Sequence, residues 1–376
     1  MNGELTARQA LLILNALPNI GPITLNRLLE ELGGDPCAVL QSPVRRLESV
    51  KGVGPAISGT VVNWRDHFDL KREEDRMARA GADFVIPDDA GYPRMLKEIH
   101  DSPIGFYRKG KYGFNHPCIA IVGSRRTTIY GQSVAKRFAA ELARLGFCIV
   151  SGLARGIDTA AHEGALSVNG RTAVVLGSGI DIIYPPENLQ LYRQIEASGA
   201  ILSEFPFGRR ADRQSFPMRN RVVAGICDAV IVVESDVIGG SMITARFAGE
   251  QGRLVYAVPG RIDQASSAGC HQLIRDGATL LTSVDDILAE LNYLDGLRPS
   301  PIPLREKAGD DATAAAELSE AETSIMAFFS GGELLPADLL AEKSGQPVHE
   351  VAVLLMQLEL KRLVAKRTDG KFEARA

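Results

Sequence analysis

The chain has 376 residues, a net charge of −4, and 45% hydrophobic against 23% charged residues. This length suggests two or three domains, and the composition excludes a disordered chain and gives no overall sign of a polyanion-binding protein. The basic residues, however, are 31 arginines and only 11 lysines. Arginine suits bidentate phosphate contact and base stacking, but codon bias in a GC-rich genome explains the excess equally well. The positions of the arginines have to decide between these two explanations.

The cysteine and hydropathy patterns indicate where the protein works. The five cysteines are scattered without a C-x-x-C pair, and no H-E-x-x-H motif occurs, so neither a disulfide framework nor a metal site is indicated. The N-terminus lacks the basic cluster and long apolar stretch of a signal peptide. Apolar runs such as 172–176 are far shorter than the ~20 residues that a bilayer requires. We therefore expect a cytoplasmic protein without a membrane span, a metal or another cofactor.

Residues 1–107 are predicted to form a mostly helical domain of the helix–hairpin–helix or SAM-like kind. Gly21-Pro22 and Gly54-Pro55 each precede a segment with helical apolar spacing. Glycine supplies a tight turn, and proline favours the first position of a helix. Such turns expose backbone N–H groups that can bind a phosphate. A small bundle that only packs accounts for them equally well.

Residues 108–296 alternate between strand-like and helix-like segments. The strand-like runs are rich in Val, Ile and Leu without period-two alternation, which is typical of parallel strands covered on both faces. We predict an extended Rossmann-like α/β domain with a doubly wound, mostly parallel sheet. The predicted strands span 118–122, 148–151, 173–176, 200–204, 229–234, 254–258 and 278–282. The predicted helices include 132–145, 159–166, 188–197 and 242–251.

The last part of the chain is predicted to be a linker followed by a small domain. Residues 297–316 contain three closely spaced prolines and then mixed charges, as in a poorly ordered linker. Residues 317–376 contain three helix-like stretches and an alternating hairpin, which outline a winged-helix domain. Its third helix, 348–360, is apolar or acidic along most of its length. We therefore expect protein interaction or a structural cap rather than base readout.

Glycine-rich phrases directly follow several predicted strands of the middle block. The carboxyl ends of parallel strands line the ligand crevice of such sheets, where glycine permits close backbone approach and helix N-termini attract anions. Two phrases add an arginine, Arg125 and Arg155, that can bind a phosphate. The phrases lie at 123–126, 151–158, 176–179, 239–241 and 258–260. They predict a nucleotide or anion site, but no complete dinucleotide fingerprint or P-loop motif supports an NAD enzyme or a P-loop ATPase.

The segment 205–221, FPFGRRADRQSFPMRNR, concentrates positive charge. It holds five arginines against one aspartate, with three phenylalanines between them. Basic side chains that follow a backbone and aromatic side chains that stack on bases are typical of single-strand binding. A solvated loop, with phenylalanines in the core and arginines in water, explains the same pattern. Beside the glycine-rich crevice we favour nucleic-acid binding, with 219–221 leading into a helix.

Four acidic or basic side chains are candidates for catalytic or sugar-binding groups. Asp158 and His162 lie four residues apart on one predicted helix, a spacing that permits acid–base coupling. We favour a plainer interpretation, in which Asp158 is an N-cap and His162 is partly exposed. Glu204 and Glu234, at strand ends, could bind sugar hydroxyls, but no nucleophile accompanies them.

The motifs of the middle block occur together and in order. They are GSR at 123–125, SGLARGID at 151–158, LGSGIDIIYPPEN at 176–188, SEFP at 203–206, FPMRNR at 216–221, GGSMITA at 239–245 and AVPG at 257–260. In these motifs the chain resembles the DNA-processing protein A family, also called DprA or Smf. The helical first block and winged-helix last block resemble its longer members. The resemblance implies a non-enzymatic protein that binds and protects single-stranded DNA, forms a homodimer, and helps to load the RecA recombinase onto incoming DNA in natural transformation.

The resemblance also implies which residues contact DNA. Matched motif by motif, the implied DNA- or phosphate-binding residues are Gly123, Ser124, Arg125, Gly152, Arg155, Gly156, Arg213, Arg219, Asn220, Arg221, Gly240 and Ser241. The chain departs from the family pattern at two positions. His271 stands where the family usually has Asn, and Pro186 stands where a basic residue is frequent. Polar contacts at these two positions are therefore not carried over.

Two other functions remain open from the sequence. A nucleotide phosphoribohydrolase on a related α/β fold would use Glu and Arg around a Gly-Gly loop, with Glu234 as the carboxylate to test. Its P-G-G-x-G-T-x-x-E signature is absent from the chain. A transcription regulator would use residues 317–376 for sequence-specific duplex binding.

Overall fold

The computed structural model describes residues 4–291, 318–329, 333–361, 363–367 and 370–374. The chain forms two compact units, one of residues 1–127 with 134–302 and the other of residues 128–133 with 303–376. The predicted linker at 297–316 lies outside the described residues.

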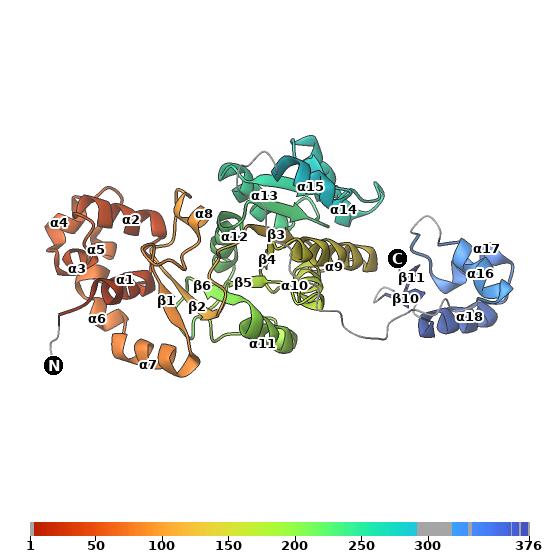
Figure 1. Ribbon diagram of the computed structural model, residues 1–376, viewed down its shortest axis with the longest axis horizontal. Helices are drawn as coiled ribbons and strands as arrows, with labels where there is room; N and C mark the ends of the chain where they lie inside the picture. The colour runs from red at the N-terminus through yellow and green to blue at the C-terminus, as the bar shows by residue number, and fades with distance from the viewer. Residues whose placement is uncertain (1–3, 292–317, 330–332, 362, 368–369, 375–376) are drawn as a thin grey trace. The chain divides into compact units, whose positions relative to one another are not determined.

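The N-terminal part of the first unit is a bundle of short helices, red to orange in Figure 1. As predicted, Gly21 and Gly54 are N-caps, and the prolines that follow them occupy the first helical positions. Leucines, valines and Trp64 of these helices form a common core. The helices are α1 (Ala7–Ala16), α2 (Pro22–Glu31), α3 (Pro36–Gln41), α4 (Val44–Glu48), α5 (Pro55–Val62), α6 (Trp64–His67) and α7 (Leu70–Ala80).

The centre of the first unit is a sheet that contains nine strands in the described residues. Their order is β1-β2-β6-β5-β4-β3-β7-β8-β9, and all neighbours from β6 to β9 are parallel. The strands β1 and β2 pair antiparallel with each other, and β2 pairs antiparallel with β6. The strands are β1 (Asp83–Val85), β2 (Phe106–Gly110), β3 (Cys118–Val122), β4 (Cys148–Ser151), β5 (Thr172–Leu176), β6 (Ala200–Ser203), β7 (Ala229–Val232), β8 (Leu254–Ala257) and β9 (Thr279–Leu280).

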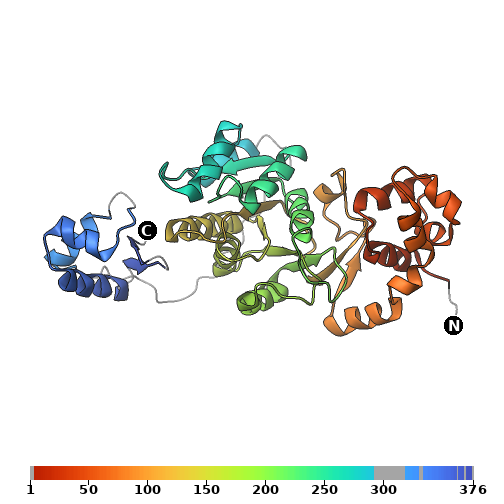
Figure 2. The same ribbon diagram turned by 180° about the vertical axis from the view of Figure 1, so that it is seen from behind.

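Helices cover both faces of this sheet, which explains why its strands read as unbroken apolar runs. In β3, Ala120 and Val122 belong to one core cluster, while Ile119 and Ile121 belong to the cluster on the opposite face. The first face is covered by α8 (Arg94–Lys97), α12 (Ser215–Ile226), α13 (Gly240–Glu250) and α14 (Ala265–Arg275). The opposite face is covered by α9 (Ile129–Arg144), α10 (Ile157–Ser167) and α15 (Val284–Leu291). Figure 2 shows the same layers from behind.

The seven predicted strands and four predicted helices of the middle block are confirmed, with ends that differ by a few residues. The helix predicted at 188–197 corresponds to α11 (Leu189–Ser198), preceded by the short turn η1 (Pro186–Asn188). Two strands of the sheet were missed. β1 lies within the part expected to be mostly helical, and β2 crosses the predicted domain boundary at residue 107. Both are short; β1 lies at the edge of the sheet, and β2 pairs on its other side with β6, which is distant in the sequence.

The second unit has its own core and the outline predicted from the sequence. Helices α16 (Glu320–Ala327), α17 (Ala337–Ser344) and α18 (Val348–Leu360) precede a hairpin of β10 (Val364–Lys366) and β11 (Phe372–Ala374). Ile325, Leu340 and Leu355 are fully buried between these elements. Three helices and a hairpin form the predicted winged-helix arrangement.

Candidate nucleic-acid interface

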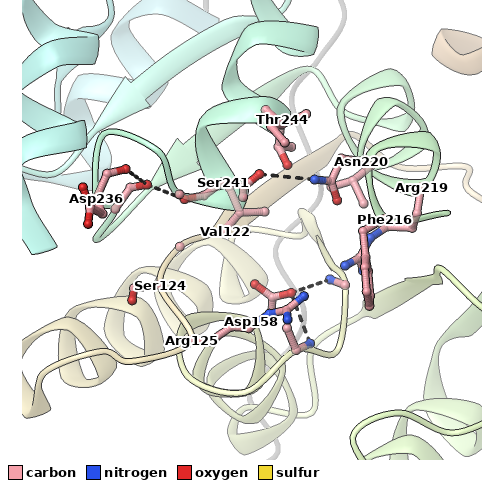
Figure 3. A pocket seen from close by; sticks show the side chains of 18 of the residues that line it. Val122, Ser124, Arg125, Asp158, Phe216, Arg219, Asn220, Asp236, Ser241 and Thr244 are labelled. Carbon is pink, nitrogen blue, oxygen red and sulfur yellow. Dashed lines mark hydrogen bonds between the residues drawn. The ribbon is translucent and has the colours of Figure 1, made fainter. Parts of the chain in front are cut away.

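A cavity of about 580 Å³ lies at the carboxyl ends of β3, β4 and β7 (Figure 3). The chain leaves β3 toward β4 on one side and returns to β7 on the other, so the strand order reverses at β3. Open parallel sheets bind ligands at such a switch point. Three of the five glycine-rich phrases, those after β3, β4 and β7, reach this cavity.

The first two loops are held together by close backbone contacts. Gly156 has a φ of +81°, and a Cβ atom there would lie 2.3 Å from the carbonyl oxygen of Ser124. The same carbonyl accepts the N–H of Ile157 at 3.2 Å, and the N–H of Ser124 donates to the carbonyl of Glu234 at 2.7 Å. Glycine at 156 is therefore required by both the backbone conformation and the close approach.

Arg219 of α12 forms a buried wall of the cavity. Its Nη1 donates to the carbonyl oxygen of Val175 at 2.8 Å, whereas its Nε is buried without a hydrogen-bond partner. A Cβ atom on Gly152 would lie 1.6 Å from Nη1, so only glycine leaves room for this guanidinium. Burial lowers the pKa of Arg219, and the nearby carboxylate of Asp158 opposes this effect.

Asp158 shapes the second loop. Its Oδ2 accepts the N–H groups of Gly152 at 3.1 Å and Ala154 at 3.2 Å (Figure 3). Burial raises the pKa of Asp158, while Arg219 and these two donors lower it. The carboxylate therefore fixes the backbone of the loop.

An exposed cation and an aromatic ring lie at the mouth of the cavity. The guanidinium carbon of Arg125 lies 5.0 Å from the ring centroid of Phe216, which is a cation–π contact. Arg125 is exposed, and Phe216 is partly buried. A ring and a guanidinium side by side offer one group for base stacking and another for the adjoining phosphate.

The opposite wall is the start of α13. Gly239 is the N-cap, Gly240 is the first helical residue, and the Nδ2 of Asn220 donates to the Gly240 carbonyl at 3.2 Å. The Oγ of Ser241 donates to the Oγ of Ser235 at 2.7 Å. The positive end of this helix dipole therefore points toward the cavity, as anion binding requires.

The structure brings most of the sequence-predicted residues together. Eight of them line the cavity: Gly123, Ser124, Arg125, Gly152, Arg219, Asn220, Gly240 and Ser241. Arg155 lines a smaller adjoining pocket instead. Gly156 supports the loops from behind, and Arg213 is exposed outside both hollows. Contact of any of these residues with DNA stays a prediction.

Arg221 was placed in the DNA pocket by its motif, but the structure places it elsewhere. Its guanidinium is buried, pairs with the carboxylate of Glu204 at 2.5 Å, and donates to the carbonyl of Asp101 at 2.6 Å. Burial raises the pKa of Glu204, and Arg221 opposes that rise. This ion pair accounts for Glu204, which was considered above as a sugar ligand.

The segment 205–221 is also not a single loop. Phe205 and Phe207 fill the core, but α12 already begins at Ser215, so Phe216 lies on a helix. Phe216 was not singled out as a site residue from the sequence. Pro217 lies in the first turn of α12, where a proline is tolerated.

The interpretation of Asp158 and His162 needs correction in both parts. The N-cap of α10 is Gly156, not Asp158. His162 is completely buried, and its Nδ1 lies 2.6 Å from the Oγ1 of Thr172. Thr172 donates its own proton to the carbonyl of Ile149, so His162 Nδ1 is the donor. Burial lowers the pKa of His162 to about 3, which leaves a neutral structural histidine.

The remaining candidate groups lie outside the cavity. Glu234 is buried, accepts a hydrogen bond from Thr127 Oγ1 at 2.6 Å, and does not line the cavity. The carboxylates that do line it are Asp158 and Asp236, which do not reproduce the hydrolase arrangement. His271 donates from Nε2 to the carbonyl of Gly260 at 2.9 Å, so this departure from the family pattern supports a loop.

Two further properties concern metals and membranes. In the ranges that the structure describes, no three His, Cys, Asp or Glu side chains gather closely enough to hold a metal ion. Across those same ranges, every helix is too short or too polar to span a membrane.

Comparison with known proteins tests the resemblance noted above. The family model for DNA recombination-mediator protein A matches residues 83–292, and the model for the DprA winged-helix domain matches residues 309–370. The chain belongs to the DprA/Smf family. The first match begins at the start of β1, so it covers the whole sheet, and the second covers the three helices and the first hairpin strand of the winged-helix unit. Both confirm the predicted fold class.

Relatives of this DprA/Smf family member cover most of its length. Protein Smf from Escherichia coli is 38% identical over 76% of each chain. The structure of DprA from Streptococcus pneumoniae is similar with a TM-score of 0.67 and 34% identity, over 77% of this chain and 99% of that one. A structure of DNA processing protein A from Helicobacter pylori, reported for its single-stranded DNA binding mode, has a TM-score of 0.51 and 30% identity, over 56% and 96% of the two chains.

Proposed function

We propose that this protein binds single-stranded DNA in the cavity at the carboxyl ends of β3, β4 and β7. It protects incoming DNA there and helps to load RecA onto it in natural transformation, acting in the cytoplasm as a homodimer and without a catalytic step. The observation that carries the proposal is the contact between Arg125 and Phe216 at the mouth of a cavity whose wall contains Arg219. Family membership and the single-strand binding of the Helicobacter pylori relative support it.

The groups that line the cavity can bind single-stranded DNA of any base sequence. Arg125 and the start of α13 attract phosphate, and Phe216 presents a ring to a base. The buried Arg219 adds a positive charge that water screens poorly. These groups recognise the backbone and the π-face that all nucleotides share, so binding is expected to be independent of base sequence.

The test is a salt series of single-strand binding with Arg125→Ala. Losing one phosphate contact should reduce the log–log salt slope by about 0.7 and weaken binding about tenfold at low salt. Arg193→Ala, an exposed arginine on α11 outside the cavity, is the matched control and should bind as the wild type does. Equal affinity of wild type and Arg125→Ala, together with an unchanged slope, would contradict binding in this cavity.

Arg219→Ala gives a second, different test. It should also weaken single-strand binding, but because the side chain is buried it should lower the free energy of unfolding as well. Affinity is therefore compared only at temperatures where circular dichroism shows both proteins folded.

Double-stranded DNA of unrelated sequence should compete poorly with single-stranded DNA for binding to the wild-type protein in the same assay.

RecA loading and dimerisation need their own experiments. We expect the protein to shorten the lag before RecA assembles on single strands coated with a single-strand-binding protein, and Arg125→Ala to lose this effect. Sedimentation should give twice the mass of one chain. RecA assembly at the same rate with and without the protein would remove the loading function and leave DNA binding in place.

A further inference from the structure

We propose that Tyr184 and Arg155 form a second nucleotide subsite beside Phe216. In the absence of DNA the Glu187 carboxylate forms an ion pair with the Arg155 guanidinium, and a phosphate of the bound single-stranded DNA displaces it. The inference rests on the proposed single-strand binding in the main cavity. It adds the direction in which the bound DNA leaves the main cavity, and it identifies Glu187 as a side chain that competes with a DNA phosphate for Arg155.

The subsite lies over the smaller pocket that adjoins the main cavity, with the exposed ring of Tyr184 at its border. This pocket encloses about 30 Å³, and five of its lining residues also line the main cavity: Arg125, Gly152, Ala154, Phe216 and Arg219. Arg155, Tyr184 and Pro185 belong to the smaller pocket alone. The main cavity and the smaller pocket therefore share one wall. A DNA strand that leaves the main cavity across this wall passes Tyr184.

Tyr184 has the geometry of a stacking platform. Its ring centroid lies 6.4 Å from that of Phe216 with an angle of 50° between the planes. The residue is 47% exposed, so its ring is accessible to a ligand. A base that stacks on this ring removes apolar surface from water, and neighbouring rings can take consecutive bases of a strand.

Arg155 supplies the charge for the phosphate between these bases. It lies in the loop after β4 and forms an ion pair with Glu187, the second residue of η1. The side chains of Arg155 and Glu187 are 58% and 50% exposed, so water and salt screen the pair and it holds the guanidinium weakly. A phosphate can therefore take the place of the Glu187 carboxylate, and Glu187 lowers the affinity by competing.

A tryptophan at position 184 would report on the subsite directly. The only native tryptophan is Trp64, which is buried in the N-terminal bundle. Base stacking should quench the fluorescence of Tyr184→Trp when an oligothymidylate binds, while the wild type shows no change. Leu280→Trp, which replaces a 46% exposed residue on β9, is the control and should not be quenched.

Affinity measurements test the two side chains separately. Tyr184→Ala should weaken binding of a roughly twelve-nucleotide oligothymidylate about 5- to 100-fold, and Tyr184→Phe should restore it. Glu187→Gln should tighten binding about two- to fivefold and steepen the salt slope, whereas Arg155→Ala should abolish that gain. Glu163→Gln, which removes a similarly exposed partner of Lys136, should change nothing.

The outcomes separate this inference from the proposed function. Unquenched Tyr184→Trp fluorescence and unchanged affinity of Tyr184→Ala, in a protein that still loses binding with Arg125→Ala, would overturn the second subsite alone. If Arg125→Ala instead bound single-stranded DNA as tightly as the wild type does, the proposed function would be overturned. A Glu187→Gln variant that binds no more tightly than Glu163→Gln would overturn the competing role of Glu187.

Discussion

At the scale of single residues, the arginines of segment 205–221 have different environments. Arg219 is buried against the cavity, Arg221 is buried in an ion pair with Glu204, and Arg213 is exposed outside both hollows. A glycine decides the first of these environments, because only the missing side chain at 152 leaves space for the Arg219 guanidinium. Charge in the sequence therefore does not translate directly into charge in the cavity.

Gly152→Ala should disrupt this arrangement. The new Cβ would meet Arg219 Nη1 at 1.6 Å, so the guanidinium has to leave its bond to Val175. We expect a loss of about 1–3 kcal/mol in the free energy of unfolding, measured by urea denaturation, together with weaker single-strand binding. Gly249→Ala, in a helix with nothing within 4 Å, should be neutral or stabilising. Equal stability of Gly152→Ala and wild type would contradict the packing described here.

His162 should make stability depend on pH. Its folded-state pKa of about 3 lies below the value near 6.5 of an exposed histidine, so between these pH values only the unfolded chain binds the proton. The free energy of unfolding should therefore fall by up to about 5 kcal/mol as pH decreases from 6.5 to 3, with no contribution at neutral pH. The difference between wild type and His162→Asn in urea denaturation at several pH values isolates this effect.

The variant His162→Asn keeps a donor for Thr172 but does not titrate. It should be less stable than wild type at neutral pH, because the smaller side chain leaves a void, and the two should converge in acid. Parallel pH profiles of the two proteins would show that His162 is not buried in the neutral form.

At the scale of elements, α12 places residues that line the cavity on one face and a buried ion-pair residue on the opposite face. Phe216, Arg219, Asn220 and Val223 all line the cavity, with the i, i+3, i+4, i+7 spacing of one helix face. Arg221 lies two residues from Arg219, about 200° around the helix, and therefore points away from the cavity. The same helix presents one arginine to the proposed ligand and buries another against Glu204.

Arg221→Met should destabilise the protein without changing its cavity. Removing the guanidinium leaves the Glu204 carboxylate buried and unpaired, which should cost about 3–5 kcal/mol in the free energy of unfolding. Adding Glu204→Gln should recover part of this loss. Arg246→Met, which removes an exposed ion pair with Glu250, should change stability by less than about 0.5 kcal/mol. Single-strand affinity of folded Arg221→Met should equal that of wild type.

At the scale of the whole molecule, the two units have separate cores. The residues that line the cavity all lie between positions 122 and 266, within the first unit. The core of the winged-helix unit consists of residues from 325 to 372. We therefore expect the cavity to be complete without the last part of the chain.

A chain that ends at residue 302 should bind single-stranded DNA within about twofold of the full-length affinity, since it keeps every lining residue. The comparison uses the same oligothymidylate and salt series. A larger loss in the shortened chain would show that the winged-helix unit contributes to DNA binding. Specific duplex binding by isolated residues 317–376 would support the transcription regulator instead.

The sequence alone predicted the parallel core of the sheet, because strands covered on both faces must be apolar throughout. It also predicted a site built from glycine-rich loops: those after β3, β4 and β7 reach the cavity, whereas the phrases at 176–179 and 258–260 do not line it. The edge strand β1 and its neighbour β2 were not predicted, because both are short and β2 joins the sheet through β6, which is distant in the sequence. Phe216 was not predicted as a site residue, because the sequence does not show which of the three phenylalanines in 205–221 fill the core and which one lines the cavity.

Composition alone does not show whether the excess of arginine over lysine serves phosphate recognition. Local spacing determined that arginines gather in 205–221 and at two loop tips. Tertiary structure decided which of them reach the cavity, because neighbouring helical positions face opposite directions and burial depends on what packs there. Arg125 and Arg219 line the cavity, Arg155 is held by Glu187 in the adjoining pocket, and Arg221 stabilises the fold.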